Sequence, residues 1–343
     1  MSQLTDRLAE VQPYWEAYWR GDVPMVVSTV PKPDCERVLP PPWGALRYHS
    51  VAEVGRQLLG WVRSHDFAGG AVPGYAVSMS AGFISRLVGA QLETCGDSAR
   101  VVPCIDDLSA AEIRFDPDGP VWQRFLNCTR ELQEICGDEV MICAPCLGGN
   151  LDLLDGLRGT TELLLDLIDN PEGVHHCLRQ LDAVHEELIA RADEIFRVPE
   201  LGKVNRHGMY CRGHLSIPQC DFSCMISPDM FREFGVPYLH REMQRLDGVE
   251  YHLDGPDAIC HLEAMCELPE VNLIQWVPGA GNERRDWTEL FDRIDALGKG
   301  QLRGGALAGF ESARKRYSSP WLYWMMGGMS PAEVNALTRE ILG

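Results

Sequence analysis

The sequence lacks an excess of basic residues and lacks any long uncharged apolar run. Its 343 residues contain 31 Lys and Arg against 50 Asp and Glu, which gives a formal net charge of −19. Binding to duplex nucleic acid or to an anionic membrane surface depends on clustered Lys and Arg, so we expect neither partner. No stretch reaches the roughly 18 consecutive apolar residues of a membrane span, so we expect no transmembrane segment.

The first 21 residues do not have the pattern expected of an export signal. Asp6, Arg7, Glu10 and Glu16 interrupt the apolar positions there, whereas a signal peptide has an uncharged apolar core. We therefore expect a cytoplasmic protein whose 13 cysteines are mostly reduced thiols, since an odd number cannot all pair. Homodimers are the commonest assembly of soluble enzymes, and the sequence leaves a homodimer open.

Short apolar runs alternate with helical patterns along the chain, and the runs number close to eight. Their continuous apolar character is typical of parallel strands that are buried on both faces. The predicted strands are 24–30, 75–80, 140–144, 208–212, 249–254, 271–277, 302–308 and 322–326, and the main predicted helices are 160–168, 171–196, 227–246 and 287–297. This alternation predicts one α/β domain over residues 1–343, a (β/α)8 TIM-type barrel with an N-terminal helical extension.

The segment 249–256, Val-Glu-Tyr-His-Leu-Asp-Gly-Pro, places His252 and Asp254 two residues apart at the end of a predicted strand. Alternate residues of a strand face the same side, and barrel enzymes carry their chemistry at the C-terminal strand ends. An imidazole and a carboxylate so placed can share a divalent metal such as zinc, or one can orient the other for proton transfer. A buried histidine satisfied by its neighbour is the alternative without a catalytic role.

Polar residues near the ends of other predicted strands are expected to converge on the same rim. Asp221 stands too early to cap the helix that begins after Ser227, which favours a catalytic role for its carboxylate. The cationic residues near 206–214 would suit a substrate that carries a carboxylate or phosphate, and pairing with structural Asp or Glu is the open alternative. The predicted substrate-binding residues are Arg206, Tyr210, Arg212, His214, Gln219, Gln275 and Trp276.

Cysteines provide a second and weaker candidate for metal binding. Cys143-Ala-Pro-Cys146 ends the third predicted strand, and a Cys-x-x-Cys pair can bind zinc or cycle through a disulfide. A structural zinc site with four ligands normally has a second such pair, which the sequence lacks. Further thiolates on the same rim could come from Cys211, Cys220 and Cys224.

Three segments together resemble the uroporphyrinogen decarboxylase superfamily, in particular its branch similar to corrinoid-dependent methyltransferases. They are 218–234, 251–256 and 274–279. The resemblance spans nearly the whole chain and implies a β/α barrel with its site at the strand C-termini. It also implies a small-molecule substrate, a zinc or other divalent metal, and a corrinoid bound to a partner protein.

The sequence departs from the superfamily's known members at two places. Uroporphyrinogen decarboxylases open with an arginine-rich loop that grips the substrate carboxylates, whereas 24–35 offers Lys32 and no such signature, so porphyrinogen decarboxylation is disfavoured. The methyltransferases bind zinc through a His-x-Cys pair and a distant Cys. Here Asp254 stands in place of the first Cys and 326–329 contains none, although ligation by His and Asp is chemically reasonable.

The sequence therefore predicts an enzyme that moves a methyl group between a corrinoid carrier and a small substrate. His252, Asp254 and Asp221 are its predicted catalytic residues, and His252 and Asp254 its first predicted metal ligands. A decarboxylase of a small acid is the second hypothesis, and a barrel that binds a ligand without catalysis is the third.

Overall fold

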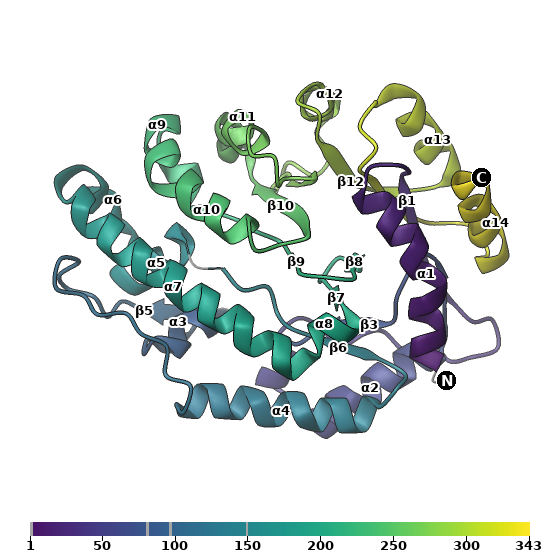
Figure 1. Ribbon diagram of the computed structural model, residues 1–343, viewed down its shortest axis with the longest axis horizontal. Coiled ribbons are helices and arrows are strands. Elements are labelled where there is room, and N and C mark those ends of the chain that lie inside the picture. The colour runs from purple at the N-terminus through teal and green to yellow at the C-terminus, as the bar shows by residue number, and fades with distance from the viewer. Residues whose placement is uncertain (1–2, 80–81, 96–97, 149) are drawn as a thin grey trace.

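The computed structural model describes residues 3–79, 82–95, 98–148 and 150–343 and has a mixed α/β architecture (Figure 1). Its central sheet contains seven strands in the order β2-β1-β13-β12-β11-β10-β9. Neighbours in this sheet run parallel, except that β2 is antiparallel to β1. The strands are β1 (Met25–Pro31), β2 (His65–Gly69), β9 (Leu215–Ser216), β10 (Gly248–Asp254), β11 (Leu273–Val277), β12 (Gly300–Gly305) and β13 (Leu322–Met326).

Three smaller sheets contain the remaining strands of the described residues. β3 (Gly74–Ala76) pairs in parallel with β6 (Met141–Cys143). β7 (Lys203–Val204) and β8 (Tyr210–Cys211) are antiparallel, as are β4 (Gln91–Cys95) and β5 (Ser98–Val102). Since these strands belong to four separate hydrogen-bonded sheets, the closed eight-stranded barrel stays a prediction. The first strand of the chain does pair in parallel with the last, β13, as strands of a closed ring do.

Helices lie around the outside of the strands (Figure 1). Within the described residues, no helix is both long and apolar enough to cross a membrane. The helices are α1 (Gln3–Trp19), α2 (Val51–Arg63), α3 (Phe83–Leu87), α4 (Pro120–Cys136), α5 (Leu151–Arg158), α6 (Thr160–Asp169), α7 (Pro171–Phe196), α8 (Val198–Leu201), α9 (Pro228–Met230), α10 (Val236–Met243), α11 (Leu262–Cys266), α12 (Thr288–Ala296), α13 (Leu307–Arg316) and α14 (Pro331–Leu342). Short 3-10 turns are η1 (Ala45–Arg47), η2 (Asp221–Met225) and η4 (Pro256–His261).

Each of the eight predicted strands overlaps an observed strand, although Ser80, at the end of the second, lies outside the described residues. The helix predicted at 171–196 is confirmed as α7, where the Asn170 side chain accepts the Gly173 N–H at 3.1 Å and Pro171 fits the first turn. β8 differs from the prediction in its direction, because it returns antiparallel to β7 instead of joining the parallel sheet.

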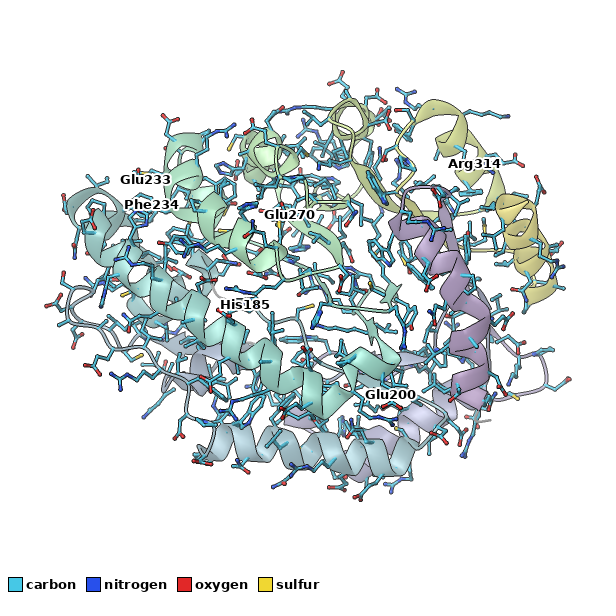
Figure 2. The ribbon with its side chains drawn as sticks, viewed as in Figure 1. His185, Glu200, Glu233, Phe234, Glu270 and Arg314 are labelled. Atoms are coloured by element: carbon cyan, nitrogen blue, oxygen red, sulfur yellow. The ribbon has the colours of Figure 1, made fainter. Side chains whose placement is uncertain are left out.

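The helix predicted at 227–246 is interrupted by the π-helical turn η3 (Phe231–Gly235) between α9 and α10. Pro237 has no N–H to continue the regular ladder, so the hydrogen-bond pattern shifts just before it. Phe234, which projects from this turn in Figure 2, stacks on His175 of α7 with the ring centroids 4.8 Å apart. The interruption therefore redirects an aromatic side chain onto a neighbouring helix.

Side chains of β10 alternate between the two faces of the central sheet, one of which packs against the outer helices. Tyr251 and Leu253 are buried in the apolar cluster formed with α7, α10 and α11. Glu250, His252 and Asp254 therefore share the opposite face of the strand. This alternation aims one buried and two partly exposed polar side chains away from the outer helices.

The predicted N-terminal extension is confirmed as α1, whose aromatic face closes one side of the inner apolar cluster. Trp15 lies 6.0 Å from Tyr323 of β13 and 6.4 Å from Tyr210 of β8, between ring centroids. Burying one such aromatic side chain contributes about 2 to 3 kcal/mol to folding. α1 is thus part of the core.

Candidate metal centre

Three neighbouring segments bring polar side chains together at the C-terminal end of β10. Gln219 forms a parallel bridge with His252, whose backbone N–H donates to the Pro218 carbonyl at 3.0 Å. On the other side of β10, Gln275 of β11 stands directly opposite His252. This register places Asp221, which begins η2, near the His252 ring.

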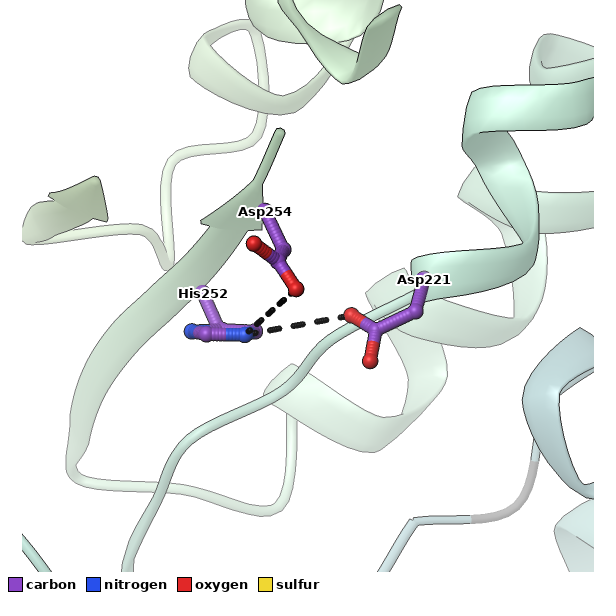
Figure 3. A group of neighbouring side chains, drawn as sticks. All are labelled: Asp221, His252 and Asp254. Carbon is purple, nitrogen blue, oxygen red and sulfur yellow. Dashed lines mark ion pairs between the residues drawn. The ribbon is translucent and has the colours of Figure 1, made fainter. Parts of the chain in front are cut away.

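Asp221, His252 and Asp254 form a triad (Figure 3). The His252 Nε2 atom lies 3.9 Å from Asp221 Oδ1 and 3.9 Å from Asp254 Oδ2. The imidazole is largely buried, whereas the carboxylates are 49% and 38% exposed. Among the described residues this is the one group of three His, Cys, Asp or Glu whose ligand atoms all lie within 4.8 Å of one another.

The Gln275 side chain fixes the orientation of the imidazole. Its Oε1 contacts His252 Nδ1, and a carbonyl oxygen can only accept, so Nδ1 donates the proton. The Nε2 lone pair then faces two carboxylates at distances too long for hydrogen bonds. Burial is the main cause that lowers the pKa of His252, which keeps the ring neutral. Three electron-pair donors directed at one point favour a bound cation, and an outer amide that orients the ring is usual for ligating histidines.

Repulsion between the two carboxylates also favours a bound cation. The pKa of Asp221 is raised, first by burial and then by the negative charge of Asp254, while Arg206 acts in the opposite direction. A divalent ion between the carboxylates would remove this penalty, because the ion is the largest local charge in such a site. The electrostatics thus agree with the geometry.

Asp152, which the sequence analysis missed, holds the Asp221 segment in place. Its carboxylate accepts the backbone N–H groups of Asp221 at 3.0 Å and Phe222 at 2.9 Å. Burial and the nearby Asp221 charge raise the pKa of Asp152 to about 6. Asn150 caps the same helix, α5, and donates to the Gln219 carbonyl at 2.9 Å. The cap is visible in the sequence, but its partners some 70 residues away are not.

The structure keeps four predicted substrate-binding residues away from the triad. Tyr210 and Arg212 line a different cavity beside α1, and Arg212 donates to the carbonyl of Glu200, which Figure 2 shows at α8. His214 lies 2.7 Å from Asp193, and Trp276 packs at 4.8 Å on Trp287, on the helix side of β11. For Arg212 and His214, structural partners were the alternative to substrate binding that the sequence analysis left open.

The cysteines named with the metal ligands do not join the triad. Cys143 and Cys220 are buried, Cys146 is partly buried and Cys224 is exposed. Cys143 Sγ accepts the Val204 N–H at 3.3 Å, and burial raises the pKa of its thiol to about 11. Within the described ranges, no cysteine belongs to a group of three potential ligands.

Two cavities adjoin at Arg206, in the turn that follows β7. The first has a volume of about 320 Å³, and its polar lining includes Asp152, Gln219 and Arg206. The second, of about 550 Å³, lies among the ends of β1, β3 and β13 and is mainly apolar and aromatic. Gln219, which lines the first cavity, donates to Asp221 at 3.1 Å, so one side chain separates this cavity from the triad. Together the cavities offer space for a small molecule beside the candidate metal centre.

Tyr75, which lines the larger cavity, has an unsatisfied hydroxyl. Its Oη is buried and has no hydrogen-bond partner among the residues that the structure describes, and burial raises its pKa to about 12. A buried unsatisfied group costs about 1 to 3 kcal/mol, so Tyr75→Phe is expected to raise the free energy of unfolding of the ligand-free protein by about 1 kcal/mol. Urea denaturation of the two proteins measures this difference in the free energy of unfolding. A less stable variant would show that the hydroxyl is hydrogen-bonded in solution.

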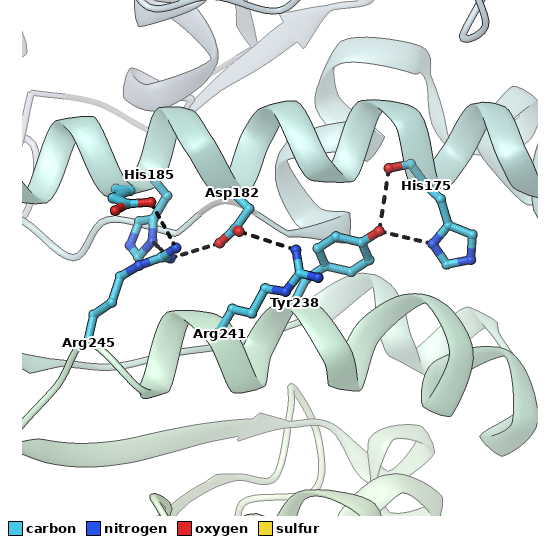
Figure 4. Close-up of polar contacts among 7 residues, drawn as sticks. His175, Asp182, His185, Tyr238, Arg241 and Arg245 are labelled. Atoms are coloured by element: carbon cyan, nitrogen blue, oxygen red, sulfur yellow. Dashed lines mark hydrogen bonds and ion pairs between the residues drawn. The ribbon is translucent and has the colours of Figure 1, made fainter.

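Histidine 185 on α7 has a structural role at the contact between α7 and α10 (Figure 4). Its Nδ1 faces Arg245 at 3.5 Å, and Arg245 pairs with Asp182 at 2.8 Å. Burial, followed by the Arg245 charge, lowers the pKa of His185 to about 4. The ring is thus held neutral in the folded protein.

This histidine should make stability pH-dependent. Between pH 4 and 6.5 the unfolded chain binds a proton at His185 that the folded chain does not, so stability rises with pH there and falls on acidification. The contribution is up to about 3 kcal/mol across this window. Urea denaturation series at several pH values should give a flatter profile for His185→Gln. An identical slope in both proteins would contradict the assignment.

The fold and the triad define a mixed α/β protein with a candidate metal centre at the C-terminal ends of parallel strands. No protein-family model matches the sequence, and no curated protein matches it. Its structure is similar to that of a methyltransferase from Methanosarcina mazei, with a TM-score of 0.53 over 94% of this chain and 96% of that chain. The two sequences are 12% identical, so this similarity concerns the fold.

Proposed function

We propose that this chain is a metal-dependent methyltransferase of the uroporphyrinogen decarboxylase superfamily, built as one (β/α)8 barrel. It would move a methyl group between a corrinoid carrier on a partner protein and a small substrate. The observation that carries the proposal is the convergence of the neutral His252 imidazole with two carboxylates at strand ends. The similarity in fold to a methyltransferase and the sequence resemblance support it further.

The donor set suits a divalent cation. One imidazole nitrogen and two carboxylate oxygens are ligands that zinc, cobalt or manganese accept, and a divalent ion balances the two negative charges. When bound, such an ion supplies Lewis acidity that lowers the pKa of a coordinated nucleophile. Among the chain's own residues, Gln275 orients the imidazole and Asp152 holds the segment that carries Asp221.

Decarboxylation of a small acid is a second candidate, which one observation favours. Because its pKa is raised, a larger fraction of the Asp221 carboxyl group is protonated at a given pH and can serve as a proton donor. Decarboxylation needs a proton to replace the departing carbon dioxide. Release of carbon dioxide in the absence of any corrinoid would separate this reaction from methyl transfer. A barrel that binds ligands without turnover is the remaining alternative.

Metal analysis and an anaerobic transfer assay test the proposal together. The purified full-length chain is loaded with zinc, dialysed and analysed for metal, then mixed with methylcobalamin and a panel of small thiols. We expect close to one zinc per chain and demethylation of methylcobalamin, followed by its visible absorbance, that Asp254→Asn abolishes. A metal-free protein would redirect the mechanism to acid–base chemistry. A metal-loaded protein with no transfer to any thiol would contradict methyl transfer to thiols.

A further inference from the structure

The larger cavity combines an apolar body with one cationic end. Its walls come from Trp61 and Phe67, from the Pro40–Trp43 segment and from Tyr323 on β13. Arg206 is the single Lys or Arg among the residues that line it. A cavity of this kind fits a flat or apolar molecule with one anionic group, because the aromatic walls supply contact area and one polar group fixes orientation.

Arg206 is free to meet an anion. It forms no ion pair with the described residues, whereas His207, the next residue, is held by Glu250 at 2.5 Å. Arg206 also lines the first cavity together with Gln219, which donates to Asp221 at 3.1 Å, so its charge lies between the larger cavity and the triad. An anionic group bound by Arg206 would therefore stand at the junction between the apolar cavity and the triad.

The charge balance at this junction depends on the metal. Without a cation, the two carboxylates outweigh Arg206 and the region repels anions. A divalent ion would balance the two triad carboxylates, so that they would no longer outweigh Arg206 in the larger cavity. The site with a bound cation would thus have the positive charge that an acid with an apolar body requires.

We propose that the substrate is a small carboxylate with a flat apolar body, its carboxylate on Arg206 and its body in the cavity lined by Trp43, Trp61 and Phe67. This assignment rests on the proposed function. Arg206 lines both cavities and so connects the larger one to the first cavity, whose lining includes Gln219 next to the triad. It narrows the substrate from any small molecule to small organic acids. It also assigns the specificity for the negative charge to Arg206, whereas Arg212 is held elsewhere by the Glu200 carbonyl.

Calorimetric titration of the zinc-loaded, full-length chain tests the assignment with benzoate and its neutral isostere benzamide as probes. A charge-assisted contact on Arg206, which is exposed, should favour benzoate about fivefold. Arg206→Gln is expected to remove this preference and to leave benzamide binding unchanged. Trp43→Ala should weaken both probes about fivefold, because it removes apolar contact area. Arg339→Gln, on the outer helix α14, is the matched control and should behave as the unmodified protein.

The outcomes separate this inference from the proposed function. Equal affinities for benzoate and benzamide, or a preference that survives Arg206→Gln, would overturn the carboxylate assignment even in a protein that holds one zinc per chain. Zinc content, measured on every sample, reports on the metal centre independently. A preference for benzoate that disappears with Arg206→Gln would establish the anion site whether or not methyl transfer is found.

Discussion

Replacing His252 with alanine is expected to abolish stable metal binding, lowering zinc affinity at least about 100-fold. Removal of an outer group that orients a ligand typically costs 10- to 100-fold, and loss of the ligand itself should cost more. The two carboxylates that remain are 49% and 38% exposed and would hold an ion weakly. Metal content after dialysis against a competing chelator, together with the shift in unfolding temperature on adding zinc, measures the loss.

Two further variants make this expectation specific. Gln275→Leu removes the amide that orients the imidazole and should weaken zinc binding about 10- to 100-fold, less than loss of the ring. His240→Ala, on the outer helix α10 where the ring faces Glu270, should retain full affinity. Unchanged zinc content in His252→Ala would place the metal elsewhere, and the triad would then be a hydrogen-bonded structural cluster.

The strand positions could be predicted because burial on both faces leaves a strong apolar pattern. The run at 322–326 is an example, since Leu322 and Trp324 pack in one apolar cluster and Tyr323 packs in another. β2 and β9 were missed for different reasons. β2 carries His65 and Asp66 among few apolar residues, and β9 is only two residues long. Its pairing with β10 comes from tertiary packing, which no local pattern reveals.

The centre of the candidate site could be predicted, but its surroundings could not. His252 and Asp254 lie on one strand, so a period of two was enough to place them on one face. Arg206 and Arg212 looked equivalent in the sequence, yet the reversal of chain direction between β7 and β8 carries them to different ends. Asp152 gave no signal at all, because its contacts with Asp221 and Phe222 depend on how α5 packs.

Glu250 is the residue whose replacement should most strongly destabilise the fold. Its carboxylate is fully buried beneath the triad, on the same face of β10. It accepts hydrogen bonds from Asn205 Nδ2 at 2.7 Å and from His207 Nδ1 at 2.5 Å. Asn205 in turn accepts the backbone N–H groups of His207 and Met209, at 3.0 and 3.1 Å. One buried carboxylate therefore holds the turn that presents Arg206 to both cavities.

Glu250→Ala is expected to lower the free energy of unfolding by about 4 kcal/mol, since it leaves a cavity and buried donors without acceptors. Glu250→Gln keeps the volume and one acceptor and should lose less, about 1 to 2 kcal/mol. Glu263→Ala is the matched control, because its pair with Arg293 is exposed and should contribute under about 1 kcal/mol. Urea denaturation compares the three. If Glu250→Ala is no less stable than Glu263→Ala, the cost of burying the carboxylate offsets its hydrogen bonds, and the turn that carries Arg206 must be held by its backbone contacts alone.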